Sequence, residues 1–293
     1  MTKRTWQLLL LVSALSTLAG LAFVARHKPP PPTEVDRPRL VPGVALHDIT
    51  FYSEALHRQM RYRVFLPEAA GEQKLPVVYL LHGGDGTFRN WSNYTDVAQF
   101  ASGALLVMPQ GDYSYYVNAA LRPQDRYEDY IVNDLPADVE RRFPARADRG
   151  GRAIIGVSMG GFGAINLALR RPEKFAFAGG MSAAIDVPRR KFTWKRLNQS
   201  RAFRDMFGPD GSDTRRNNDP FVLVRSADAS KMPYFYLTCG QQEGLLAPNR
   251  EFAALLDKGK IAHELHIVPG AHEWNQWNAA LPGVFESLHR HIK

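Results

Sequence analysis

The chain has 293 residues, of which 45% are hydrophobic, so it is long enough to bury one sizeable core. Its formal net charge is +8 at pH 7, and half of this excess comes from lysines and arginines that precede the first acidic residue, Glu34. The most basic later stretch, residues 189–216, also contains aspartates, so nothing predicts a nucleic-acid binder. A single cysteine, Cys239, excludes an intramolecular disulfide and a cysteine metal cluster.

An uncharged segment, residues 6–25, follows Lys3 and Arg4. It is about long enough to cross a bilayer as a helix, so it is either an uncleaved anchor or a signal peptide, in contact with the membrane or the export machinery. Four prolines then form a stiff spacer. We expect a signal peptide or anchor at residues 1–28, a proline-rich linker at 29–40 and the folded domain at 41–293. An exported domain of this kind is periplasmic or extracellular, and an uncleaved segment would hold it on the inner (cytoplasmic) membrane.

Short apolar runs alternate with helix-like stretches after the linker. Residues 47–52 and 59–66 alternate in polarity, which predicts an antiparallel hairpin. Further strands are expected at residues 76–81, 104–108, 153–157, 175–181, 234–239 and 264–268, and helices at 132–143, 162–170, 250–256 and 279–292. This order predicts an α/β fold with a mostly parallel central sheet and helices on both faces. Residues 187–222 break the alternation and are expected to form an insertion over the carboxyl edge of the sheet.

A serine flanked by glycines follows one predicted strand and precedes a predicted helix, in Gly156-Val157-Ser158-Met159-Gly160. This G-x-S-x-G pattern is typical of a nucleophile elbow, in which the serine sits on a strained turn. Side chains two residues before and after the serine would collide with the adjoining strand and helix, so glycine is needed there. We expect Ser158 to be a nucleophile and the Met159 N–H to face the oxygen that becomes negative during attack.

His272 lies after the last predicted strand and before the final helix, where an α/β-hydrolase fold has its base. Glu243 follows the strand at residues 234–239 after a tight turn, so its carboxylate is expected to orient His272. The chain order Ser158, Glu243, His272 matches the order of roles in this fold. Asp186, beyond the preceding strand, is the alternative acid.

A glycine pair ends the strand at residues 76–81, within Leu80-Leu81-His82-Gly83-Gly84. The α/β-hydrolase fold takes its second oxyanion donor from this loop. Glycines let the backbone approach a substrate closely. We therefore expect the N–H groups of Gly84 and Met159 to form an oxyanion hole.

Taken together, these segments resemble the putative-esterase family of α/β-hydrolases, which includes esterase D, tributyrin esterases, feruloyl-esterase domains and the mycolyltransferases. The resemblance spans residues 47–292. It rests on residues 80–84 with Trp91, 113–118, 134–136, 156–164, 239–243 and 272–277. It implies that Ser158 is the nucleophile, His272 the base, Glu243 the acid, and Gly84 and Met159 the oxyanion pair. Aromatic and amide side chains in the matching loops are expected to bind substrate, namely Trp91, Tyr115, Asn118 and Trp277.

The resemblance implies a serine carboxylesterase that hydrolyses short-chain acyl or carbohydrate-linked esters through an acyl-enzyme on Ser158. No cofactor and no metal are implied. Two alternatives stay open: an acyltransferase that moves the acyl group to a sugar or lipid hydroxyl, and a non-catalytic binding module on a hydrolase scaffold. The second alternative predicts a broken triad. The expected partner is a small-molecule or carbohydrate ester.

Overall fold

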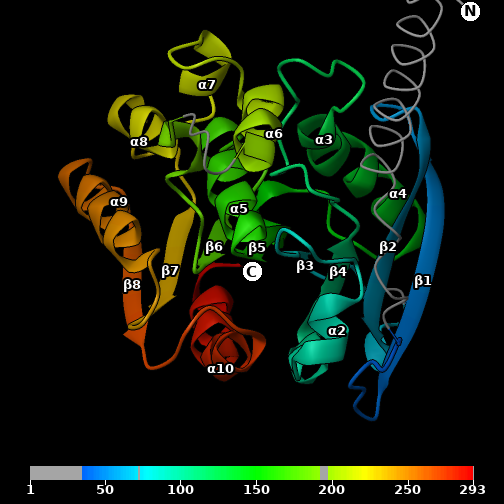
Figure 1. Ribbon diagram of the computed structural model, residues 1–293. Coiled ribbons are helices and arrows are strands. Elements are labelled where there is room, and N and C mark those ends of the chain that lie inside the picture. The colour runs from blue at the N-terminus through cyan, green and yellow to red at the C-terminus, as the bar shows by residue number, and fades with distance from the viewer. Residues whose placement is uncertain (1–34, 72, 192–196, 293) are drawn as a thin grey trace, which may run out of the picture. The chain divides into compact units, whose positions relative to one another are not determined.

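The computed structural model describes residues 35–71, 73–191 and 197–292 (Figure 1). One compact unit begins at Arg37, inside the stretch that the sequence assigns to the linker, and includes the whole predicted domain. The expected signal or anchor segment lies outside the described residues. None of the described helices has both the length and the apolar character that crossing a membrane requires.

An eight-stranded sheet forms the centre of the unit, in the order β1-β2-β4-β3-β5-β6-β7-β8. The strands are β1 (Val44–Ser53), β2 (Arg58–Pro67), β3 (Val77–Leu81), β4 (Leu105–Pro109), β5 (Arg152–Val157), β6 (Phe177–Met181), β7 (Tyr234–Gly240) and β8 (His263–Val268). β2 pairs antiparallel with β1 and with β4, and the remaining pairs are parallel. The predicted hairpin and the predicted mostly parallel sheet are confirmed.

Helices connect most of the strands and cover both faces of the sheet (Figure 1). The α-helices are α2 (Asn90–Tyr94), α3 (Tyr127–Asp129), α4 (Leu135–Arg142), α5 (Met159–Arg170), α6 (Leu197–Phe207), α7 (Asp213–Arg216), α8 (Pro220–Leu223), α9 (Leu246–Lys258) and α10 (Trp274–His291). A π-helical turn, η3 (Tyr130–Asp134), joins α3 to α4. The 3₁₀ helices are η1 (Glu68–Ala70), η2 (Val97–Gly103), η4 (Arg149–Gly151), η5 (Val187–Arg189) and η7 (Val224–Ser226).

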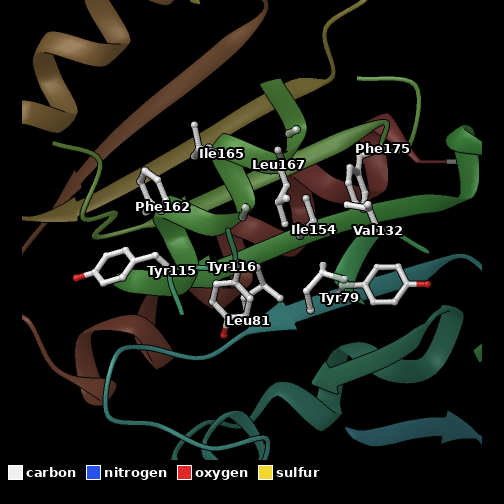
Figure 2. Packing of buried hydrophobic residues seen from close by; sticks show 14 of the residues in the cluster. Tyr79, Leu81, Tyr115, Tyr116, Val132, Ile154, Phe162, Ile165, Leu167 and Phe175 are labelled. Carbon is white, nitrogen blue, oxygen red and sulfur yellow. The ribbon is translucent and has the colours of Figure 1, made fainter. Parts of the chain in front are cut away.

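Side chains of the central strands alternate between two buried layers. Tyr79 and Leu81 of β3 pack in the layer that contains Phe162 of α5 (Figure 2). Their neighbours Val78 and Leu80 belong to the opposite layer, which α10 covers. Because both faces are covered, the central strands consist of unbroken apolar runs, and this is why their positions could be predicted.

The insertion predicted at residues 187–222 folds into η5, α6, α7 and α8, and the last three lie together at the top of Figure 1. Tyr115, in the loop that follows β4, packs its ring against Phe203 and Phe207 of α6, with ring centroids 5.6 and 5.8 Å apart. This loop leaves the carboxyl end of β4. The insertion therefore covers part of the carboxyl edge of the sheet, as the sequence predicts.

Candidate active site

Ser158 occupies the sharp turn between β5 and α5. Its backbone has φ 56° and ψ −112°, a conformation that residues with a side chain rarely adopt. A Cβ atom at Gly156 would lie 2.2 Å from the backbone of Gly160. A Cβ atom at Gly160 would lie 2.3 Å from the carbonyl oxygen of Leu81. Glycine is therefore needed at both positions for the turn to close, which is the reason the sequence pattern predicts.

Three side chains from different strand ends form a continuous hydrogen-bonded row. His272 Nε2 lies 2.9 Å from Ser158 Oγ, and His272 Nδ1 lies 2.7 Å from Glu243 Oε2. An ionised carboxylate can only accept, so Nδ1 carries the proton and donates it to Glu243. Nε2 is then the acceptor for the hydroxyl of Ser158. In this tautomer the imidazole can remove the serine proton.

Burial and hydrogen bonding act in opposite directions on the carboxyl group of Glu243. Its side chain is only 1% exposed, whereas that of His272 is 40% exposed. Besides the bond from His272, the carboxylate accepts from Ser182 Oγ at 2.6 Å and from the Gly240 N–H at 2.8 Å, both through Oε1. Burial favours the neutral acid, but these hydrogen bonds outweigh it and hold the pKa of Glu243 below its ordinary value.

Ser182 and Trp277 contact Glu243 and His272 and help to hold them in place. The indole N–H of Trp277 donates to Ser182 Oγ at 2.9 Å, which leaves the hydroxyl proton of Ser182 for Glu243. The ring of Trp277 also meets that of His272 edge to face, with centroids 5.0 Å apart. Sequence reasoning missed Ser182. The only sequence signal for it is a polar residue directly after the buried strand β6. In the structure its backbone is left-handed, with φ 47°.

The two predicted oxyanion donors come from two different segments, the loop after β3 and the start of α5. Met159 is the first residue of α5, so its N–H has no carbonyl partner one turn back in the helix. Gly84 lies in the loop after β3 and lines the same cavity as Ser158 and His272. Within the described part of the chain, the Gly84 N–H has no hydrogen-bond acceptor. Both N–H groups are therefore available to an anionic oxygen.

A cavity of about 480 Å³ opens at the row of Ser158 and His272. Glycines and polar side chains form one wall, and aromatic rings form another. The lining comprises Gly83, Gly84, Asp85, Gly86, Asn90, Tyr94, Ser158, His272, Trp274 and Trp277. The size and the mixed lining suit a small molecule that has both apolar and polar groups.

Of the four residues expected to bind substrate, the structure brings Trp277 to this cavity. Trp91 is buried behind it and packs edge to face on the ring of Trp274. Tyr115 is part of an aromatic core with rings of α5 and α6. Asn118 accepts a hydrogen bond from the backbone N–H of Asp129, the last residue of α3. These three side chains lie outside the lining of the cavity, because each is used to pack or to fix the loop that carries it.

Two other residues with reactive side chains, Asp186 and Cys239, take no part in this hydrogen-bonded row. Asp186, the alternative acid, forms a two-pronged ion pair with Arg190 at 2.8 and 3.0 Å. Cys239 is buried in β7, and burial raises the pKa of its thiol to about 12. The thiol is therefore protonated at neutral pH and suits a structural role.

Comparison with known proteins places the chain among esterases. The family model described as putative esterase matches residues 53–288. The chain is 24% identical over 260 residues to an acetyl esterase of Caldicellulosiruptor saccharolyticus, a match that covers 83% of this chain and 97% of that protein. It is 29% identical over 255 residues to esterase Rv1288 of Mycobacterium tuberculosis, covering 76% of this chain but only 54% of that relative.

A solved structure of a Staphylococcus aureus protein, the fluorophosphonate-binding serine hydrolase FphF, has a TM-score of 0.73 at 25% identity. The match covers 84% of this chain and 98% of that one. The sheet and these likenesses define an enzyme with the α/β-hydrolase fold. More than half of the chain matches the family model, so the chain belongs to the putative esterase family and is an ester hydrolase.

Proposed function

We propose that the enzyme is a serine carboxylesterase that forms an acyl-enzyme on Ser158. The observation that carries the proposal is the row of hydrogen bonds from Ser158 through His272 to Glu243, at 2.9 and 2.7 Å, which opens on the cavity. In serine hydrolases a nucleophile, a base and an orienting acid act as one unit. An unbroken row argues against the alternative of a non-catalytic binding module.

In the first half of the proposed reaction, Ser158 Oγ attacks the acyl carbon while His272 Nε2 takes the hydroxyl proton. The N–H groups of Gly84 and Met159 bind the oxygen that becomes negative. The tetrahedral intermediate then collapses, the acyl–oxygen bond to the alcohol breaks, and the alcohol leaves with the proton from Nε2. In the second half, water takes the place of the alcohol and frees the acid. Glu243 stays ionised and stabilises the imidazolium in both halves.

The lining of the cavity supports a short-chain acyl or carbohydrate-linked ester as substrate. Trp274 and Tyr94 offer aromatic faces, and Asp85 and Asn90 offer polar atoms in the same hollow. Aromatic rings beside hydrogen-bonding groups suit the mixed surface of a sugar or another small polar alcohol. The similarity to an acetyl esterase supports a small acyl group.

Hydrolysis of p-nitrophenyl acetate, butyrate and octanoate tests the proposal. We expect turnover of the shorter esters and a fall of about 10⁴-fold or more in kcat for Ser158→Ala. Ser226→Ala is the matched control, because Ser226 is exposed and, among the described residues, its hydroxyl bonds only to the Leu223 carbonyl oxygen of its own turn. Equal rates for Ser158→Ala and the wild type would refute the nucleophile. Product formation on an added sugar alcohol, in preference to hydrolysis, would instead indicate an acyltransferase.

For the N-terminus we propose export, with residues 1–28 acting as a signal peptide or as an anchor in the inner membrane. The support is the uncharged segment at residues 6–25, preceded by two basic residues and followed by four prolines. Fractionation of cells that express the full chain should recover esterase activity outside the cytoplasm. Activity in the cytoplasmic fraction alone would contradict export.

A further inference from the structure

We propose that His82 is a positioning residue: its neutral imidazole, protonated on Nδ1, fixes the direction of the Gly84 N–H and so assembles one half of the oxyanion hole. This inference rests on the proposed function, since it assigns a role in stabilising the oxyanion of ester cleavage. It concerns a side chain outside the catalytic row.

The two ring nitrogens of His82 have different partners. The backbone N–H of Gly111 points at Nε2, with a separation of 2.8 Å. An N–H can only donate, so Nε2 carries no proton and accepts. Nδ1 therefore carries the proton and donates to the carbonyl oxygen of Gly83 at 2.7 Å. The ring is wholly buried, so it has little freedom to adopt another orientation.

The carbonyl of Gly83 and the N–H of Gly84 belong to the same peptide unit. In a planar trans peptide these two groups point in opposite directions. The Gly83 oxygen is held on one side by His82 Nδ1 and by the Gly86 N–H, which lies 3.1 Å away. The Gly84 N–H must then point to the other side. Since Gly84 lines the cavity with Ser158 and finds no acceptor among the described residues, that side is where a substrate oxygen would lie.

The surroundings of His82 keep this arrangement rigid. The buried hydroxyl of Tyr116 donates to the carbonyl oxygen of His82 at 3.0 Å. The same carbonyl approaches α5 so closely that a Cβ atom at Gly160 would lie 2.6 Å from it. The loop that carries Gly84 is therefore seated directly on the first turn of the helix that carries Met159. Preorganised donors of this kind cost no reorganisation when the charge develops.

Two substitutions test the roles of the two ring nitrogens separately. In His82→Asn the amide nitrogen replaces Nδ1 and can still donate to Gly83, but nothing accepts from Gly111. In His82→Gln the side-chain amide reaches the place of Nε2 and can accept from Gly111, but the Gly83 oxygen loses its side-chain donor and keeps only the longer bond from the Gly86 N–H. Three quantities are measured for each: kcat and KM for p-nitrophenyl butyrate, the affinity for an alkyl boronic acid that forms a tetrahedral adduct, and the melting temperature.

We expect His82→Gln to lose about 10²-fold in kcat and a similar factor in boronic acid affinity, with KM little changed, because one oxyanion donor is misdirected. His82→Asn should keep kcat and boronic acid affinity within about tenfold of the wild type. A merely structural role would lower both variants together, or would lower the melting temperature without this split. Either of those results would overturn the proposal, as would wild-type kcat and boronic acid affinity in His82→Gln.

A measurement on the wild type keeps the proposal testable even if neither variant folds. Nitrogen-15 NMR of the histidine rings distinguishes a protonated from an unprotonated ring nitrogen. We expect His82 to be neutral with the proton on Nδ1, and a proton on Nε2 would overturn the inference. The proposed function fails separately, if Ser158→Ala keeps its activity. An inactive Ser158→Ala beside a fully active His82→Gln would refute only the role of His82.

Discussion

The carboxylate of Glu243 illustrates how single residues set the chemistry of the site. It is buried, a position that would ordinarily favour the neutral acid, yet three hydrogen bonds converge on its two oxygens. The sequence predicts Glu243 because it follows β7 after a tight turn. Ser182 could not be predicted in the same way, because its contact depends on β6 lying beside β7, and strand order is not visible in the sequence.

Replacement of the acid by its amide tests the orientation of the base. In Glu243→Gln the side-chain amide can donate to His272 Nδ1, which favours the tautomer with the proton on Nε2. That tautomer cannot accept the proton of Ser158. We expect kcat for p-nitrophenyl butyrate to fall by about 10⁴-fold, with KM little changed. A loss of less than tenfold would mean that another carboxylate orients the base.

Ser182→Ala tests the hydrogen bond that helps to keep the acid ionised. A carboxyl whose pKa is lowered by folding stabilises the fold above its ordinary pKa, and this contribution is lost as the pH falls through the folded-state pKa. Ser182→Ala should therefore destabilise the protein most near neutral pH, by roughly 1.5–3 kcal/mol, and less at acid pH. Urea denaturation over a pH series measures this.

The control for Ser182→Ala is the same substitution in the Glu243→Gln background. The neutral amide does not titrate, so the pH dependence of the Ser182→Ala effect should vanish there. If the destabilisation is equally pH-dependent in both backgrounds, Glu243 is not the titrating partner.

The strand-turn-helix element around Ser158 is held by close backbone contacts rather than by side-chain packing. These contacts explain why the five-residue pattern predicts the turn. Glycine is sterically required at positions 156 and 160, so the requirement can be recognised in the sequence. The buried strands can also be recognised in the sequence, by their apolar runs. Helix α2 and the 3₁₀ helix η2 were not predicted, because they are short and lack a repeating apolar face.

Gly160→Ala tests the contact between the elbow and β3. Its Cβ would lie 2.3 Å from the Leu81 carbonyl oxygen, and backbone atoms on both sides have little room to move. We expect a loss of about 3 kcal/mol in the free energy of unfolding, together with lost activity. Gly103→Ala is the matched control, because a Cβ there meets nothing within 4 Å, and it should change stability by less than about 0.5 kcal/mol. Equal effects of the two substitutions would contradict the steric account.

At the scale of the whole molecule, the sequence predicts the fold class and the meeting of Ser158, His272 and Glu243 better than it predicts which aromatic residues line the cavity. Tyr115 and Trp91 are aromatic and buried like Trp277, yet only Trp277 of the three lines the cavity. Which aromatic residues face a cavity depends on how distant loops meet, for example where α6 packs on the loop after β4. That arrangement follows from tertiary packing and has no local sequence pattern.

A chain that starts at Val35 tests whether the compact unit is the complete enzyme. The first described contacts already anchor its start, since the Arg37 N–H donates to Asn93 Oδ1 and Arg39 pairs with Asp96. We expect the shortened chain to have the melting temperature and the kcat/KM of the full chain. A clear loss of either would mean that residues 1–34 contribute to the fold or to the site.

Trapping the covalent intermediate tests the central claim most directly. The enzyme is mixed with p-nitrophenyl butyrate, quenched in acid during turnover, digested and examined by peptide mass spectrometry. The mechanism predicts a butyryl group on the peptide that contains Ser158, at Ser158 itself, and its absence from the Ser158→Ala variant. A butyryl group on a different residue, or continued turnover in Ser158→Ala, would contradict the account.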